Sequence, residues 1–399
     1  MPDKQMDFVP TPAPSKHRIH SIDILRGLVM LLMLVDHVRE RFFYHNQISD
    51  PMSLADTSTA LFFTRMTAHL CAPTFVFLTG LSAWLYANPH NKPSRDAAPF
   101  LIKRGLFLIF IEIALVNLSW FGTYHVLYLQ IIWTIGLCMI LLGLLCRLNH
   151  WFIGAIGIAL IFGNRLLDPI SFAPDEVGYT LWTILHDGGY LVAEGLVKVR
   201  AGGFPVTAWF GVICLGYVLG PLYAQSVSAF QRQKVLVTCG LLALALLTIL
   251  RGFNLYGEVE PWVVGANGLE TLKSMINFSK YPPSANFILL NLGIATLILA
   301  AMERVNNRCS QIVENFGSAP MFFYVVHLYV LLFSYKILAF LFGENKVKDT
   351  GWHQGTYFGF DHVWQIWAAA ALLAMLLYWP TKTFANYRQR TSIRWVKYF

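Results

Sequence analysis

Residues 22–43 read IDILRGLVMLLMLVDHVRERFF, and this stretch decides the fold. Every residue between Arg26 and Asp36 is apolar or glycine. The stretch is long enough to cross the hydrocarbon core of a bilayer, which takes roughly 20 helical residues. Asp23, Arg26, Asp36 and His37 are ionisable groups that are costly inside a membrane and therefore indicate function. The stretch predicts a membrane-spanning helix with polar groups near both ends.

The composition extends this interpretation to the whole chain. Hydrophobic residues make up 56% of the 399 residues and charged residues only 13%, about half of the roughly 25% usual in soluble domains. The mean hydropathy is +0.52, which excludes a disordered chain. The net charge of +8 would suggest nucleic acid in a soluble protein, but basic residues orient the helices of a membrane protein. We therefore expect membrane lipid, and no nucleic acid, around this chain.

Ten apolar runs are candidate spans, of which Trp151–Asn164 is the shortest. They are Ile22–Phe43, Met66–Tyr86, Arg104–Phe121, Val126–Leu148, Trp151–Asn164, Pro205–Tyr223, Lys234–Gly252, Pro283–Met302, Ala319–Phe342 and His362–Thr381. They predict an all-α, polytopic helical bundle of about ten transmembrane helices in one domain, residues 21–385. A tail, residues 1–20, precedes this domain, and a basic tail, residues 386–399, follows it.

The distribution of basic residues predicts the orientation. With the N-terminus in the cytoplasm, 17 of the 30 lysines and arginines fall on the inner side and 11 on the longer outer loops, with Arg26 and Lys336 inside spans. This bias follows the positive-inside rule and places both termini in the cytoplasm. We expect a multi-pass protein of the inner (cytoplasmic) membrane. The sequence is compatible with a homo-oligomer.

Three outer segments are long, roughly 45–65, 166–204 and 251–282. They contain prolines, aromatic residues and charges, as expected for structured loops over a site that opens outward. The stretch Tyr179–Lys198 has apolar residues at helical spacing and predicts an interfacial helix.

The first helix carries a possible anchor for a charged substrate group near one end, Arg26, and a possible base near the other, His37. Asp23 and Arg26 share a face, whereas His37 lies about 16 Å further along the helix at roughly 1.5 Å per residue. This spacing suits a substrate whose charged headgroup binds at the inner end while chemistry takes place at the outer end. The alternatives are a structural ion pair between Asp23 and Arg26 and a structural role for His37.

The second helix offers another histidine. Arg65 and His69 stand four residues apart, on one face of a regular helix, and Pro73 predicts a kink. His69 could face His37 across a shared cavity, so that the two divide acid and base roles. Gly80 permits close helix packing. The alternative is a kinked helix with an arginine that snorkels to the interface.

Other polar residues are weaker candidates. Glu112 lies inside the third span and needs a partner. His327 could contact a cytoplasmic cofactor or bond a backbone carbonyl. Lys280 and Tyr281, like Arg65, could bind an anionic or sugar substrate at the outer side, or could anchor the chain at the interface. No phosphate-binding loop, nucleophile elbow or zinc motif is present, so we expect no metal.

Six motifs along the chain resemble one family. They are Ser21-Ile22-Asp23-Ile24-Leu25-Arg26-Gly27 with Asp36-His37, then Cys71-Ala72-Pro73-Thr74-Phe75-Val76-Phe77-Leu78-Thr79-Gly80, Trp209-Phe210-Gly211 with Leu215-Gly216-Tyr217-Val218-Leu219-Gly220, Tyr256-Gly257 with Pro261-Trp262, Lys280-Tyr281-Pro282-Pro283-Ser284, and Pro320-Met321-Phe322-Phe323-Tyr324 with His327. Together they resemble bacterial membrane proteins with a heparan-α-glucosaminide N-acetyltransferase catalytic-like domain.

The resemblance implies a function. The family is similar to transmembrane acyltransferases that take an acyl group from cytoplasmic acyl-CoA and pass it to a sugar amine or hydroxyl on the far side. Related sugar O-acyltransferases carry an arginine, ten residues and then a histidine in the first helix, and Arg26 and His37 match this spacing. The resemblance thus implies acetyl-CoA or another acyl-CoA as co-substrate, with a periplasmic glycan or small sugar as acceptor.

Roles follow for the candidate residues. His37 and His69 are the candidate catalytic residues, as general base or as acceptor of the acyl group. Asp23, Arg26 and His327 are candidates for binding the acyl-CoA. Lysosomal-type members carry a His-x-x-Trp-Asn-Gly loop after the first helix, but residues 45–48 read HNQI here. We therefore do not expect heparan as the substrate.

Two other functions fit the same residues. A transporter or flippase for a sugar- or lipid-linked substrate would line its path with the same polar helices and would need Asp23 or Glu112. A membrane scaffold would bind a partner through the long outer loops and would need neither His37 nor His69.

Overall fold

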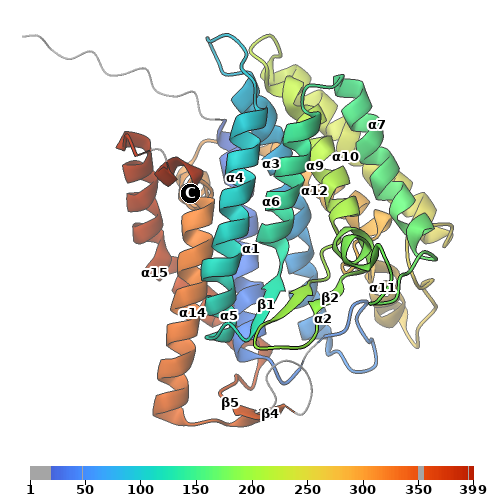
Figure 1. The fold of residues 1–399 in the computed structure, drawn as a ribbon, viewed down its shortest axis with the longest axis vertical. Coiled ribbons are helices and arrows are strands. Elements are labelled where there is room, and N and C mark those ends of the chain that lie inside the picture. Colours follow the sequence, from blue (N-terminus) through green and yellow to red (C-terminus); the bar gives the residue numbers. More distant parts are fainter. Residues whose placement is uncertain (1–18, 47, 349–354, 394) are drawn as a thin grey trace, which may run out of the picture.

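The computed structural model describes residues 19–46, 48–348, 355–393 and 395–399. Over these residues the chain is mostly helical, with 68% helix and 5% strand, and the helices form a bundle (Figure 1). The predicted all-α membrane bundle is therefore confirmed.

The α-helices are α1 (His20–Phe42), α2 (Thr59–Thr67), α3 (Cys71–Ala87), α4 (Ala98–Ile111), α5 (Asn117–Phe121), α6 (Ile131–Leu145), α7 (His150–Gly163), α8 (Tyr179–Trp182), α9 (Val206–Leu219), α10 (Ala229–Gly252), α11 (Gly268–Ile276), α12 (Ala285–Met302), α13 (Arg308–Gly317), α14 (Pro320–Phe342) and α15 (Val363–Arg390). Short 3₁₀ turns cover Ala68–Leu70, Asn164–Leu167, Gly220–Tyr223 and Trp395–Tyr398, and π turns cover Glu112–Val116 and Thr183–Asp187. The strands are β1 (Val126–Leu129), β2 (Gly189–Val192), β3 (Lys198–Ala201), β4 (Lys346–Lys348) and β5 (Gly355–Tyr357).

Within the described residues, seven helical segments are long and apolar enough to cross a membrane. They are Thr59–Ala87, His150–Leu167, Val206–Tyr223, Ala229–Gly252, Ala285–Met302, Pro320–Phe342 and Val363–Arg390. The other three predicted runs are also mostly helical: α1 carries several charges, α4 and α5 are joined by a π turn, and α6 is apolar but shorter. The full number of crossings and the cytoplasmic termini stay predictions.

The outward faces of the outer helices are apolar. Leu241 and Leu242 of α10, Phe333 and Phe340 of α14, and Leu376 of α15 are all exposed. Large exposed apolar surfaces are rare on soluble monomers, and lipid chains solvate them in a membrane. The fold is thus that of a multi-pass membrane protein.

Helix α1 lies in the middle of the bundle, with α14 and α15 on one side and α7 and α10 on the other (Figure 1). It packs against α3, α12, α13, α14 and α15. The negative Asp23 stands in its first turn and the positive Arg39 and Arg41 in its last turn, where the helix dipole favours each sign. Asp23, Asp36 and Arg39 are buried inside the bundle, whereas His20 at the start of α1 is exposed.

Glycines set the closest helix contacts. A Cβ added to Gly27 of α1 would collide with the backbone of Val313 in α13, and one added to Gly317 would collide with the backbone of Asp23. Gly80 of α3 meets the backbone of α9 in the same way. The predicted close packing at Gly80 is therefore confirmed, because only a residue without a side chain fits there.

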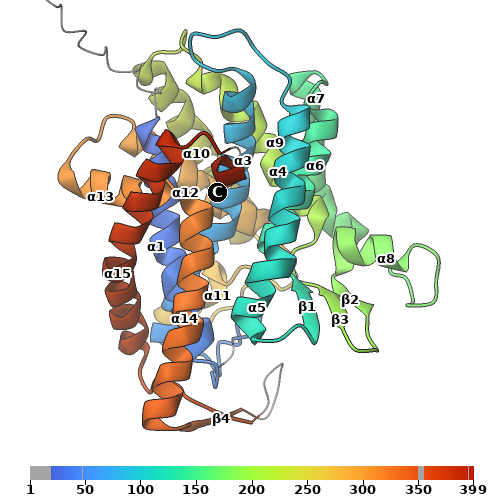
Figure 2. The same ribbon diagram turned by 60° about the vertical axis from the view of Figure 1, so that its left-hand side comes forward.

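The two ends of the bundle differ (Figure 2). The tail end holds α13 and the Trp395–Tyr398 turn, and the loop end holds both small sheets and α11. The positive-inside count predicts that the tail end faces the cytoplasm.

The first sheet corrects one predicted span. Its strand order is β1-β3-β2, with β1 parallel and β2 antiparallel to β3. Residues 126–129 were expected at the start of the span Val126–Leu148, but they form β1, and α6 begins at Ile131. A short apolar run suits a strand as well as a helix, so hydropathy does not separate the two.

The same sheet corrects the predicted interfacial helix. Within Tyr179–Lys198 only α8 and the π turn Thr183–Asp187 are helical. Gly188 and Gly189 follow with positive φ, a conformation that glycine adopts easily, and β2 begins at the second of them. The helix therefore ends after two turns.

The domain boundaries stay predictions. Residues 1–18 of the predicted tail lie outside the described residues, and α15 continues to Arg390, beyond the expected boundary at 385.

Candidate functional site

A cavity of about 1830 Å³ runs through the bundle from the tail end to the loop end. Pockets for one small molecule usually measure roughly 300–1,000 Å³. Its lining includes Arg26 and Arg388 at the tail end, His37 between the ends, and Lys280 and Tyr357 at the loop end. One cavity of this size has room for two substrates that meet inside it.

Arginines gather where the cavity approaches the tail end. Arg26, Arg104, Arg388 and Arg390 line it there. Arg26 lies 2.6 Å from the carboxylate of Asp23 and donates to the carbonyl of Gly317 at 3.2 Å. The ion pair that the sequence left open is thus present, while Arg26 still borders the cavity.

Arg104 has a different environment from Arg26. Its Nε is buried and has no hydrogen-bond partner among the described residues. It lies within electrostatic range of Arg26 and Arg388, so positive charges face one another at this end. Arg388 donates to the carbonyl of Ser318 at 2.7 Å. Like charges held together in a cavity favour a bound anion.

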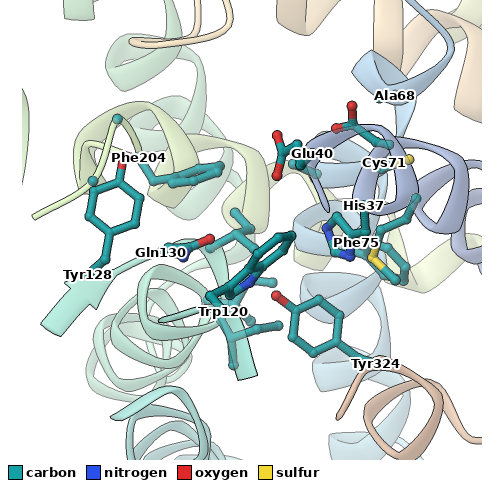
Figure 3. A pocket seen from close by; sticks show the side chains of 18 of the residues that line it. His37, Glu40, Ala68, Cys71, Phe75, Trp120, Tyr128, Gln130, Phe204 and Tyr324 are labelled. Carbon is teal, nitrogen blue, oxygen red and sulfur yellow. The ribbon is translucent and has the colours of Figure 1, made fainter. Parts of the chain in front are cut away.

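His37 borders the cavity between its two ends, and its ring faces the rings of Trp120 and Tyr324 (Figure 3). The ring centroids lie 5.2 Å from Trp120 and 5.9 Å from Tyr324, both in edge-on geometry. The predicted catalytic histidine therefore stands in an aromatic site that a substrate can reach.

The partner of His37 is His327. Nδ1 of His37 lies 2.7 Å from Nε2 of His327, and the rings stack at 5.0 Å. His327 is fully buried and does not border the cavity. Its Nδ1 lies 2.8 Å from the carbonyl of Phe323. It therefore stands behind His37, and the bond to a backbone carbonyl, one of the two interpretations of His327, is present.

His69 does not share the cavity. It is 3% exposed, its ring packs against Phe287 at 5.2 Å, and it is absent from the cavity lining. The helix changes to a 3₁₀ turn at Ala68–Leu70, which alters the rotation per residue. Arg65 therefore borders the cavity while His69 turns away, although regular helical spacing places both on one face. His37 and His69 do not face each other.

Buried ion pairs hold the loop end of the cavity. Asp36 accepts from Arg39 at 2.9 Å and from Arg65 at 3.1 Å. Arg39 also reaches Glu40 at 3.0 Å. These pairs fix Arg65, a predicted substrate-binding residue, against the first helix.

Lys280 and Tyr281 both line the cavity, as does Arg65. The backbone N–H of Lys280 donates to Asp50 at 2.9 Å, which holds the loop in place. Lys280 is only 4% exposed, and burial, together with the positive charge of Arg65, lowers its pKa to about 8. Tyr281 packs against Phe204 at 4.9 Å. The structure thus brings the three candidate substrate-binding residues to one end.

Glu112 does not border the cavity. It is fully buried, and its Oε2 accepts the backbone N–H of Trp133 at 3.3 Å, in the first turn of α6. A carboxylate at a helix N-terminus is stabilised by the helix dipole. One carboxyl oxygen of Glu112 therefore faces a helix end, whereas its buried Oε1 has no hydrogen-bond partner among the described residues.

Sequence reasoning missed Arg104, Arg388 and Tyr324 as parts of one site. Arg104 and Arg388 are basic residues near the ends of predicted spans, where basic residues are expected to orient the helices. Tyr324 lies in an apolar run. No local signal joins them, because they come from α4, α15 and α14.

The chain is similar to one family of known proteins. A family model described as heparan-alpha-glucosaminide N-acetyltransferase, catalytic, matches residues 18–250, which is more than half of the chain. This part holds Arg26, His37, Arg65 and Arg104, while Lys280 and His327 lie beyond it. No curated protein matches the chain.

Proposed function

Because this chain belongs to the heparan-alpha-glucosaminide N-acetyltransferase catalytic family, we propose that it moves an acyl group, acetyl being the expected one, from acyl-CoA on the cytoplasmic side to a sugar amine or hydroxyl on the other side of the membrane. The observation that carries this proposal is the single cavity that borders Arg26 at one end, His37 in the middle and Lys280 at the other. We propose that the membrane crossed by this chain is the inner (cytoplasmic) membrane.

The tail end of the cavity suits the phosphates of CoA. Arg26, Arg104, Arg388 and Arg390 border it, and arginine binds phosphate through two parallel hydrogen bonds. The unpartnered buried Nε of Arg104 gains a hydrogen-bond acceptor when an anion enters. Asp23 holds Arg26 in place through its ion pair.

His37 is the proposed general base. The thioester supplies the acyl group, and its thiol leaves with the proton that the acceptor gives up. His37 takes this proton from the acceptor amine or hydroxyl while the new bond to the acyl carbon forms and the carbon–sulfur bond breaks, and then returns it to the thiolate. Trp120 and Tyr324 limit the access of water around the ring of His37.

The loop end suits a sugar acceptor. Trp120, Tyr128 and Tyr281 offer aromatic faces in the cavity lining, and Glu40 and Gln130 offer hydrogen-bond acceptors. Apolar walls with a few placed polar groups are the usual construction of small-molecule sites. We propose that a glycan or a small sugar binds here, beside Arg65, Lys280 and Tyr281.

A vesicle assay tests the proposal. The purified protein is reconstituted in liposomes, acetyl-CoA labelled in its acetyl group is added on one side, and sugar amines and alcohols are offered on the other. We expect labelled sugar that His37→Ala abolishes while CoA still binds. Absence of CoA binding at roughly millimolar concentration would overturn the proposal.

The same vesicles distinguish transport of the sugar from acyl transfer. Uptake of the sugar without acylation, surviving His37→Ala but lost in Asp23→Asn, would show that the cavity is a transport path and not a reaction site.

A further inference from the structure

The hydrogen bonds of His327 determine where its proton lies. A backbone carbonyl only accepts hydrogen bonds, so Nδ1 of His327, 2.8 Å from the carbonyl of Phe323, carries a hydrogen. A neutral imidazole has one N–H, so Nε2 of His327 holds a lone pair. The fully buried site of His327 favours this neutral form, because burying an unpaired charge is costly.

The same argument determines the position of the hydrogen on His37. Its Nδ1 lies 2.7 Å from Nε2 of His327, and since that nitrogen accepts, Nδ1 of His37 donates. The one hydrogen of neutral His37 is then on Nδ1. Nε2 of His37 is left with a lone pair, and it is the nitrogen still open to a substrate, because the ring of His37 borders the cavity.

We propose that His327 is a positioning residue that holds His37 in the Nδ1–H tautomer, so that Nε2 of His37 faces the cavity as a base. The inference rests on the proposed function for its catalytic meaning. When Nε2 takes a proton from the acceptor, His37 becomes a cation whose Nδ1–H bond to His327 is charge-assisted and therefore stronger. His327 accepts the hydrogen bond from His37 that a carboxylate accepts in the Ser-His-Asp triad.

A purely structural histidine would bond the carbonyl alone. The stacked rings, whose planes differ by 13°, and the short bond between two ring nitrogens join α14 to His37, which among the histidines of the described residues is the one that borders the cavity. Asp36, Arg39 and Arg41 on α1, and Lys280 from the loop before α12, are charged groups within electrostatic range of His37. The described contacts give none of them a hydrogen bond to its ring.

Nitrogen NMR of histidine-labelled protein in bilayers tests the tautomer directly. We expect the His37 signals, assigned by their loss in His37→Gln, to show a protonated Nδ1 and an unprotonated Nε2. In His327→Phe we expect this signature to disappear, because no acceptor remains for Nδ1–H. A wild-type His37 protonated on Nε2 would overturn the inference.

Kinetics provide the second readout. We expect His327→Phe to lower kcat by roughly 10- to 100-fold with an unchanged Kd for CoA. His327→Gln should recover part of this loss, because the amide oxygen accepts from Nδ1–H. The matched control is His150→Phe, since His150 also bonds a carbonyl, that of Val218 at 2.8 Å, but does not border the cavity.

The outcomes separate the two proposals. The expected tautomer together with no acyl transfer by the wild-type protein would overturn the proposed function and support the pairing. An unchanged kcat in a folded His327→Phe variant would overturn the positioning role, even where transfer itself is confirmed.

Discussion

Arg26 and His37 border the same cavity although they stand 11 positions apart on α1, about 16 Å along the axis at roughly 1.5 Å per residue. One rigid helix therefore sets the distance between the anion-binding end and the proposed base.

Replacing Arg26 by alanine should weaken acetyl-CoA binding. A charge-assisted hydrogen bond is worth about 1.5–3 kcal/mol, so we expect Kd and KM to rise roughly tenfold to a hundredfold with little change in kcat. Calorimetry and initial rates measure this. Arg147→Ala is the control, because Arg147 pairs with Asp96 at the surface, away from the cavity. An unchanged Kd with lower thermal stability would make Arg26 a structural residue only.

Replacing His37 and His69 separately should distinguish the two candidate bases. We expect His37→Ala to lower kcat roughly 10²- to 10⁴-fold, the usual contribution of a general base. His69→Ala should lower the Tm more than kcat, because the ring of His69 packs against Phe287 and not in the cavity. Equal losses of kcat in both folded variants would contradict the structure-based choice.

Replacing Lys280 by methionine should change how stability depends on pH. Its pKa is about 8 in the folded protein and near 10.4 in an unfolded chain. Between these values the unfolded state binds more protons, so the free energy of unfolding rises with pH from about 8 to 10.4. We expect the wild-type Tm to rise across this window relative to Lys280→Met, which lacks the titrating group. Parallel Tm curves from pH 7 to 10 would contradict this.

Replacing Gly80 by alanine should destabilise the α3–α9 contact. The added Cβ would collide with the backbone carbonyl of Ile213, and overpacking a core costs about 1–3 kcal/mol. Gly163→Ala is the matched control, because nothing lies within 4 Å of the Cβ it would add. Thermal unfolding in detergent compares the two, and equal changes in Tm would show that the close approach has no role in stability.

The sequence by itself determined the class of fold. The transfer of each apolar side chain into lipid contributes nearly independently of its neighbours, so runs such as Ala319–Phe342 and Lys234–Gly252 identify membrane helices without knowledge of what they touch. The same reasoning fails at Val126–Leu129, where pairing with β3, a distant segment, turns an apolar run into a strand. Six motifs along the chain also indicated the family, because each motif is made of residues that lie close together in the sequence.

Only the tertiary structure decided which polar residues meet. His37 and His327 are 290 positions apart. Arg104 and Arg388, which lie within electrostatic range of each other, come from different helices, so no spacing predicts that either pair lies close together. A 3₁₀ turn of three residues turned His69 away from the cavity, and glycine contacts at Gly27 and Gly317 set how α1 lies against α13. Pairing depends on the rotation and approach of whole helices, which arise from packing summed over many residues, whereas hydropathy is a property of each residue alone.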